Sequence, residues 1–142
     1  MIHLGADHRG FKAKENLKKY FDKQGIKYTD HGASTLDPKD DYPDYAHKVA
    51  QAVAKDRKAR GIIICGSGFG VAITANKTKN IRATVLYSPA QAYIARQHND
   101  INVACLLTMF QKQKDHTKII DTFLNTRFAG GRHLRRLKKI EK

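Results

Sequence analysis

Short apolar runs alternate along this chain with amphipathic segments of helical length, and this alternation restricts its fold more than any other feature. The clearest run is Gly61-Ile62-Ile63-Ile64-Cys65, which is apolar throughout, as a central parallel strand covered on both faces would be. Further runs predict strands at residues 2–6, 26–30, 82–86 and 102–107. Helical patterns cover residues 11–24, 45–57, 71–77, 89–97, 114–124 and 133–140. The alternation predicts a three-layer α/β fold, with helices on both faces of a five-stranded parallel sheet.

Length and composition restrict the possibilities further. The 142 residues correspond to a single domain spanning residues 1–142, with the C-terminal helix included. Hydrophobic residues make up 41% of the chain and charged residues 28%, which excludes an intrinsically disordered protein. The longest apolar stretches fall far short of the roughly 20 residues that a membrane-spanning helix needs. No secretory signal and no disulfide framework are visible, so we expect a cytoplasmic protein.

The chain is strongly basic, with 27 Lys and Arg against 13 Asp and Glu, a net charge of +14. Residues 112–142 contain ten basic residues and only three acidic ones. Such a segment can bind nucleic acid, supply arginines to a small anionic substrate, or simply form a solvated surface, and composition alone favours the last. No aromatic stacking platform or recognition helix accompanies the basic residues, so nucleic-acid binding is the less favoured function.

In sheets of this kind, ligands bind beyond the carboxyl ends of the strands. Three segments qualify: Asp7-His8 after the first strand, the segment after the fifth strand, and the glycine loop that follows the third strand. That loop reads Cys65-Gly66-Ser67-Gly68-Phe69-Gly70, and its alternate glycines let successive N–H groups converge into an anion-binding nest. A nest also lowers the pKa of a thiol at its edge, which would make Cys65 a base near neutral pH.

Each of these features also has a purely structural interpretation. The glycine loop can be a tight strand-to-helix turn beside an inert cysteine, and its spacing fits neither a dinucleotide-binding loop nor a Walker loop. Asp7 can be a helix cap rather than a proton carrier. His98 can be a C-terminal helix histidine that interacts with the helix dipole. No histidine has metal-ligand spacing with the cysteines, so no metal site is expected.

Taken together, the motifs of this chain resemble those of the type B ribose-5-phosphate isomerases, whose wider family includes galactose-6-phosphate and allose-6-phosphate isomerases. The segments that carry the resemblance occur in the same order and span nearly the whole chain: Asp7-His8, Asp41-Tyr42-Pro43-Asp44-Tyr45, Cys65 to Gly70, Ala75-Asn76-Lys77, His98-Asn99-Asp100 with Asn102-Val103, and Gly130-Gly131-Arg132-His133 with Arg136.

The resemblance implies a Rossmann-like α/β/α sandwich that forms a homodimer or a dimer of dimers, with active sites shared between subunits. It implies isomerisation of ribose 5-phosphate to ribulose 5-phosphate through an enediolate, or otherwise of allose 6-phosphate or galactose 6-phosphate, without metal or organic cofactor. By this resemblance the catalytic residues are Cys65, His98 and Asp7: Cys65 is the base, His98 of the neighbouring subunit opens the ring, and Asp7 contacts the sugar. The other implied substrate-binding residues are His8, Gly66, Ser67, Gly68, Phe69, Gly70, Asn99, Arg132 and Arg136.

The chain departs from the family pattern at three positions. Ser67 stands where the family usually has Thr, and keeps the hydroxyl. Val71 stands where another branch uses a glutamate as base, which places this chain with the cysteine branch. Met109 stands where the family usually has a further phosphate-binding arginine, and the loss of one charge-assisted contact weakens phosphate binding by about 1.5–3 kcal/mol. Arg9, which follows the Asp-His pair, is a candidate to compensate for this loss.

Overall fold

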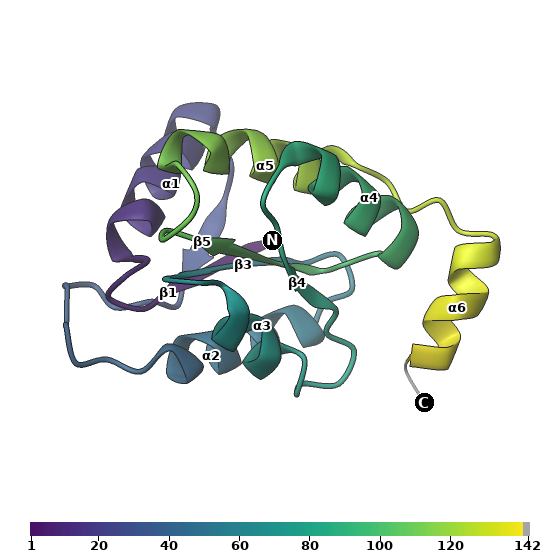
Figure 1. The fold of residues 1–142 in the computed structure, drawn as a ribbon, viewed down its shortest axis with the longest axis horizontal. Helices are drawn as coiled ribbons and strands as arrows, with labels where there is room; N and C mark the ends of the chain where they lie inside the picture. The colour runs from purple at the N-terminus through teal and green to yellow at the C-terminus, as the bar shows by residue number, and fades with distance from the viewer. Residues whose placement is uncertain (141–142) are drawn as a thin grey trace.

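A computed structural model describes residues 1–140 and confirms the predicted fold class (Figure 1). Five strands form one sheet in which all neighbouring strands are parallel, in the order β2-β1-β3-β5-β4. Their bounds are β1 Ile2–Ala6, β2 Tyr28–Asp30, β3 Arg60–Cys65, β4 Ala83–Val85 and β5 Val103–Leu107. The central position of β3 agrees with its uninterrupted apolar sequence, since residues 61–65 are all buried.

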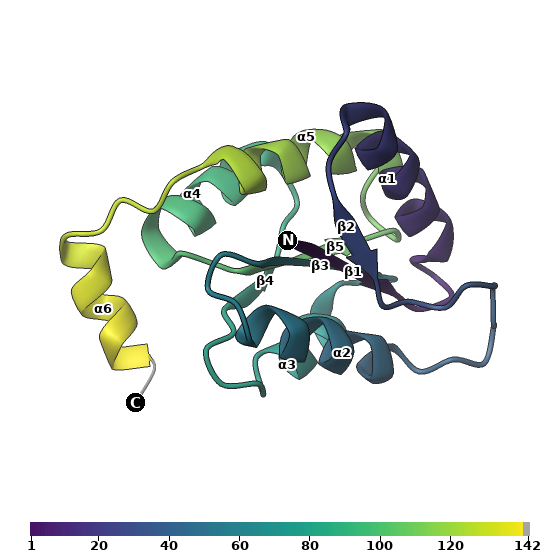
Figure 2. The same ribbon diagram turned by 180° about the vertical axis from the view of Figure 1, so that it is seen from behind.

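Helices cover both faces of the sheet (Figures 1 and 2). Their bounds are α1 Phe11–Gln24, α2 Tyr42–Ala54, α3 Phe69–Ala75, α4 Pro89–Asn99, α5 Gln113–Asn125 and α6 Arg132–Ile140. Helices α1, α4 and α5 bury their apolar residues in one core cluster with Leu4, Ile62 and Leu106. Helices α2 and α3 pack against the other face, in a second cluster with Ile63, Cys65 and Cys105. The three layers of the predicted sandwich are therefore confirmed.

Most predicted bounds differ from the observed ones by one to three residues, and two of these differences have clear local reasons. The sequence predicted a helix from residue 45, but α2 begins at Tyr42, because Pro43 lies in its first turn, where a missing N–H and a fixed φ are tolerated. The sequence also predicted a strand from residue 26, but β2 begins at Tyr28. Gly25 ends α1 in the left-handed conformation with φ 67°, and the Ile26 N–H donates to the Phe21 carbonyl at 2.9 Å. Ile26 therefore belongs to the helix cap rather than to the strand.

Helix α6 stands away from the three layers, beside the end of α4 (Figure 1). Gly130 and Gly131 turn the chain into it with φ values of 67° and 52°, a conformation that glycine adopts without steric cost. His133 and Leu137 are the buried side chains of this helix, and its arginines are exposed. The predicted domain extends to residue 142, and residues 141–142 lie outside the described residues. Within residues 1–140, no helix has the length and apolar character to cross a membrane.

Candidate active site

The sheet places Asp7 and Cys65 side by side at its carboxyl edge. Strands β1 and β3 are neighbours, and their register pairs Ala6 with Ile64. Asp7 directly follows β1 and Cys65 is the last residue of β3, so the two residues lie at the same edge of the sheet. The chain runs from β1 outward to β2 and then returns to β3 on the other side of β1, so this is also the point where the strand order reverses. Ligands of open parallel sheets bind at such a point.

Cys65 is a buried thiol, with only 4% of the residue exposed. The Gly68 N–H donates a hydrogen bond to its sulfur at 3.1 Å, as the nest interpretation requires. Burial nevertheless raises the pKa of the thiol above its usual value, and the nearby Asp7 carboxylate raises it further. The sequence predicted a lowered pKa, and this was wrong, because the hydrogen bonds from the loop N–H groups do not offset the loss of solvation.

The glycine loop forms a tight turn between β3 and the short helix α3. Gly68 has a φ of 79°, in the left-handed region where a side chain would be strained, so the loop depends on glycine there. Ser67 is half-buried and its hydroxyl accepts a long hydrogen bond of 3.4 Å from the Phe69 N–H. At the far end of the loop Gly70 packs under the Tyr42 ring, since a Cβ added at Gly70 would lie 2.8 Å from the Tyr42 hydroxyl oxygen. Tyr42, which belongs to one of the segments that carry the family resemblance, therefore lines the loop.

Asp7 is buried beside this loop, with 6% of the residue exposed. The Gly10 N–H donates to its carboxylate at 3.0 Å, and burial raises the pKa of the carboxyl group above its usual range. The helix-cap interpretation does not hold in its simple form, because the residue at the cap of α1 is Gly10 and no side chain caps that helix. Asp7 instead stabilises the turn before α1, and its position next to Cys65 allows it to carry or accept a proton.

Asp40 fixes the orientation of His8, a role that was not predicted from the sequence. One Asp40 carboxylate oxygen, Oδ1, lies 2.7 Å from His8 Nδ1 and also accepts the His8 backbone N–H at 2.9 Å. The side chain of Asp40 is 6% exposed and that of His8 is 32% exposed, so the histidine faces the solvent side of the site. The polar loop between β2 and α2 brings Asp40 here. Its sequence shows several acidic residues but no signal for the one that reaches His8.

The remaining candidate residues lie at the opposite edge of the sheet. His98 and Asn99 are the last two residues of α4, which ends shortly before β5 begins. The His98 ring stacks on the His133 ring of α6, with centroids 4.2 Å apart and an interplanar angle of 10°. Arg132 and Arg136 lie exposed on the same helix, and burial and these positive neighbours lower the pKa of His133. The group of candidate residues at this edge therefore consists of His98, Asn99, Arg132 and Arg136.

Within one chain the two groups of candidate residues do not meet. The group around Cys65 lies beyond the carboxyl ends of the strands, and the His98 group lies near their amino ends. Strand β5 between these edges has five residues at about 3.3 Å each, a separation of roughly 16 Å along the sheet. A pentose phosphate cannot contact both groups on the same chain. The structure brings Asp7, His8, Cys65 and the glycine loop together at one edge of the sheet. It places His98, Asn99, Arg132 and Arg136 at the other edge.

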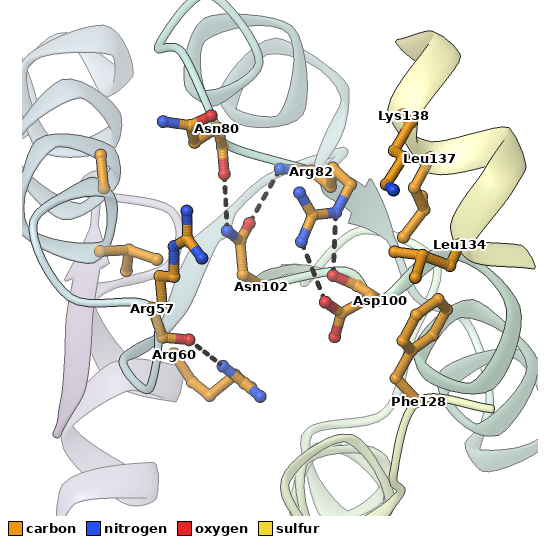
Figure 3. Close-up of a pocket in the computed structure, with 12 residues that line it drawn as sticks. Arg57, Arg60, Asn80, Arg82, Asp100, Asn102, Phe128, Leu134, Leu137 and Lys138 are labelled. Atoms are coloured by element: carbon orange, nitrogen blue, oxygen red, sulfur yellow. Dashed lines mark hydrogen bonds and ion pairs between the residues drawn. The ribbon is translucent and has the colours of Figure 1, made fainter. Parts of the chain in front are cut away.

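A cavity of about 480 Å³ lies at the amino-terminal edge, between α6 and the sheet, away from Cys65 (Figure 3). The basic residues that line it are Arg57, Arg60, Arg82 and Lys138 (Figure 3), and both Arg60 and Arg82 donate hydrogen bonds to main-chain carbonyls. Arg60 donates to the Ala59 carbonyl at 2.8 Å, and Arg82 donates to the Asp100 carbonyl at 3.0 Å. The cavity contains no thiol or histidine, so we do not assign the chemistry of the protein to it. In the part of the chain that is described, no three His, Cys, Asp or Glu side chains are arranged to hold a metal ion.

Comparison with known proteins connects this arrangement to one family. The family model described as Ribose/Galactose Isomerase matches residues 2–140. The chain is 42% identical over 139 residues to the probable ribose-5-phosphate isomerase B of Mycoplasma pneumoniae, covering 98% of this chain and 91% of that protein. It is 38% identical to the ribose-5-phosphate isomerase B of Escherichia coli, covering 98% of this chain and 93% of that protein.

A solved structure gives the same result for the fold. The crystal structure of ribose-5-phosphate isomerase B from Mycoplasma genitalium, with bound ribulose-5-phosphate, superposes with a TM-score of 0.95 at 40% identity. The superposition covers 99% of this chain and 93% of that chain. Sequence and structure agree over nearly the full length, and the resemblance inferred from the motifs is confirmed: this chain belongs to the ribose/galactose isomerase family.

Proposed function

We propose that this protein is an aldose–ketose isomerase that interconverts ribose 5-phosphate and ribulose 5-phosphate, with Cys65 as the base. Membership of the family and the isomerases among its relatives support the reaction. The observation that carries the cysteine mechanism is the position of the Cys65 thiol, buried at the point where the strand order reverses, with Asp7 beside it and the Gly68 N–H on its sulfur.

The reaction moves one proton between two carbons. In the open-chain aldose, the Cys65 thiolate removes the C2 proton, and the electron pair of that bond forms a C1–C2 double bond as the C1 carbonyl becomes an enediolate oxygen. The thiol then returns the proton to C1, and the C2 hydroxyl proton passes to the C1 oxygen, so that C2 becomes the ketone and C1 carries the new hydroxyl group. The raised pKa of Cys65 makes its thiolate a stronger base once formed, and the loop N–H groups stabilise the charge that develops on oxygen. Asp7 and His8 hold the sugar hydroxyls.

A second copy of the chain completes the site in this proposal. His98 of that copy donates a proton to open the furanose ring, Asn99 contacts the sugar, and Arg132 and Arg136 bind the phosphate in bidentate fashion. Support comes from the separation of the two groups in one chain, because a sugar phosphate can reach both only if they come from different copies. Exposed apolar side chains near the β4 edge favour such an assembly: Phe69, Ile73, Ile94 and Ile140.

The whole chain acts in this proposal as one isomerase domain in the cytoplasm, without a cofactor. Base, acid and oxyanion donors are sufficient for the chemistry, and all three are side chains or N–H groups of the protein. Cys65 and Cys105 are both free thiols, as a reducing compartment would keep them. The basic C-terminal segment then supplies arginines to an anionic substrate rather than to nucleic acid. A parallel assay of ribose 5-phosphate, allose 6-phosphate and galactose 6-phosphate tests which sugar is preferred.

The test of the cysteine mechanism uses the two cysteines as a matched pair. Cys65→Ala should abolish isomerisation of ribose 5-phosphate and leave the thermal unfolding midpoint close to wild type, because it removes a single sulfur atom at the end of β3. Cys105→Ala removes the other buried cysteine, from a strand on which no chemistry is proposed, and should retain turnover. A Cys65→Ala protein that isomerises ribose 5-phosphate at the wild-type rate would refute the role of the thiol.

A further inference from the structure

Arg9 places a guanidinium at the mouth of the Cys65 site. It follows Asp7 and His8 in the turn between β1 and α1, and the residue is exposed. Its side chain packs against Gly66, the first glycine of the glycine loop, since a Cβ added at Gly66 would lie 2.8 Å from Arg9 Cδ. Gly66 directly follows Cys65, so the charged end of Arg9 is confined to the entrance of the site by the packing of its aliphatic part.

The guanidinium of Arg9 has no anionic partner among residues 1–140, whereas Lys14 and Lys18 on the following helix are both paired with acidic side chains. Lys18, on the helix that follows Arg9, is held by Asp30 at 2.9 Å and by Glu15 at 3.0 Å. The acidic groups closest to the Cys65 site are Asp7, which accepts main-chain N–H groups, and Asp40, which binds His8. Among residues 1–140, the site therefore contains one cation without an anionic partner, beside the carboxylates of Asp7 and Asp40, which accept hydrogen bonds from other groups.

We propose that Arg9 binds the phosphate of the substrate from the same chain that supplies Cys65. This inference rests on the proposed sugar-phosphate isomerisation and specifies which residue of this chain contacts the phosphate. The guanidinium is exposed while the thiol is buried, so Arg9 contacts the end of the substrate that lies away from the reacting carbons. A planar guanidinium forms two parallel hydrogen bonds to a phosphate, which suits this end of the ligand.

Met109 forms the other side of the same entrance. A Cβ added at Gly66 would lie 3.2 Å from Met109 Sδ, so the methionine and the aliphatic part of Arg9 cover the same glycine. Met109 follows β5 and is held there by its N–H, which donates to the Gly66 carbonyl at 3.0 Å. Its thioether carries no charge, so Arg9 is the residue at this entrance that can neutralise a phosphate. An arginine side chain at position 109 would also begin beside Gly66 and would contact the same phosphate group.

Inorganic phosphate, used as a competitive inhibitor of ribose 5-phosphate isomerisation, probes the site directly. Arg9→Gln should raise the inhibition constant for phosphate and the KM for ribose 5-phosphate by about 10- to 100-fold, with little change in kcat, because the contact is the same in ground and transition states. Lys12→Gln is the matched control, since it removes one exposed positive charge three residues away and should change neither constant. Arg9→Gln combined with Met109→Arg should recover part of the lost affinity.

Three results would overturn the proposal. The first is an unchanged inhibition constant for phosphate in Arg9→Gln. The second is an equal effect of Lys12→Gln, which would indicate a general charge effect. The third is a loss of kcat with unchanged KM, which would place Arg9 at the reacting carbons. Failure of the proposed function gives a different result, because wild-type protein would then not isomerise ribose 5-phosphate at all.

Discussion

A mixture of two inactive variants should recover activity if each active site is shared between two chains. Cys65→Ala removes the proposed base from the carboxyl edge, and His98→Gln removes the proposed ring-opening acid from the opposite edge. The roughly 16 Å between these edges means that the two substitutions affect different groups of residues. In a mixed dimer, one site receives both substitutions and the other receives neither. The second site is then identical to a wild-type site.

The expected recovery follows from the statistics of mixing. Random exchange of equal amounts makes roughly half of all dimers mixed, and each of these has one intact site out of two, so about a quarter of the wild-type activity should return. The assay measures ribulose 5-phosphate formation after the variants have been mixed and allowed to exchange subunits. Circular dichroism of each variant verifies that it is folded, which matters for His98→Gln because the His98 ring stacks on His133.

A second mixture provides the control. Asp7→Asn and Cys65→Ala both alter the group at the carboxyl edge, so a mixed dimer of these two variants has no intact site and should remain inactive. If Cys65→Ala and His98→Gln also fail to recover activity although subunit exchange is demonstrated by a labelled chain, the shared site is refuted. Recovery in both mixtures would also contradict it, because it would mean that the variants regain activity by some other route.

Two further predictions concern the carboxyl edge. Because burial raises the pKa of the Cys65 thiol, this thiol is neutral in the free protein at neutral pH. The value of kcat/KM should therefore rise with pH through the neutral range and level off only above the usual thiol range. A flat pH profile between about pH 6 and 9 would exclude Cys65 as the group that must ionise. Asp40→Asn keeps an acceptor for the His8 backbone N–H but removes the charge that orients the His8 ring, so kcat/KM should fall about tenfold. Asp37→Asn, in the same loop, should have no effect. Equal activity of the two variants would show that Asp40 does not position His8.

The sequence predicted the framework of the site because two strong physical rules applied to it. A strand as apolar as residues 61–65 has to be central, and the ligands of a parallel sheet lie beyond its carboxyl ends. These rules were enough to select Asp7 and Cys65 from the sequence alone. The contact between Asp40 and His8 was not predictable in this way, because it depends on the path of an irregular loop of about ten residues between β2 and α2. The pKa of Cys65 was predicted with the wrong sign, because the balance between burial and N–H donors depends on packing that a motif does not describe.

The fold itself gives a physical reason for a site divided between chains. A parallel sheet delivers the residues that follow its strands to one edge only, so a single chain can surround a substrate from one side. The carboxyl edge here provides a base, N–H donors and one arginine, and it also carries the two buried carboxylates of Asp7 and Asp40. A dianionic phosphate needs more positive charge than this edge contains. In the proposed dimer the exposed arginines of α6, which stands away from its own core, bring that charge to the partner's substrate. Two of the ten basic residues at the end of the chain, Arg132 and Arg136, then have a role in binding across the interface.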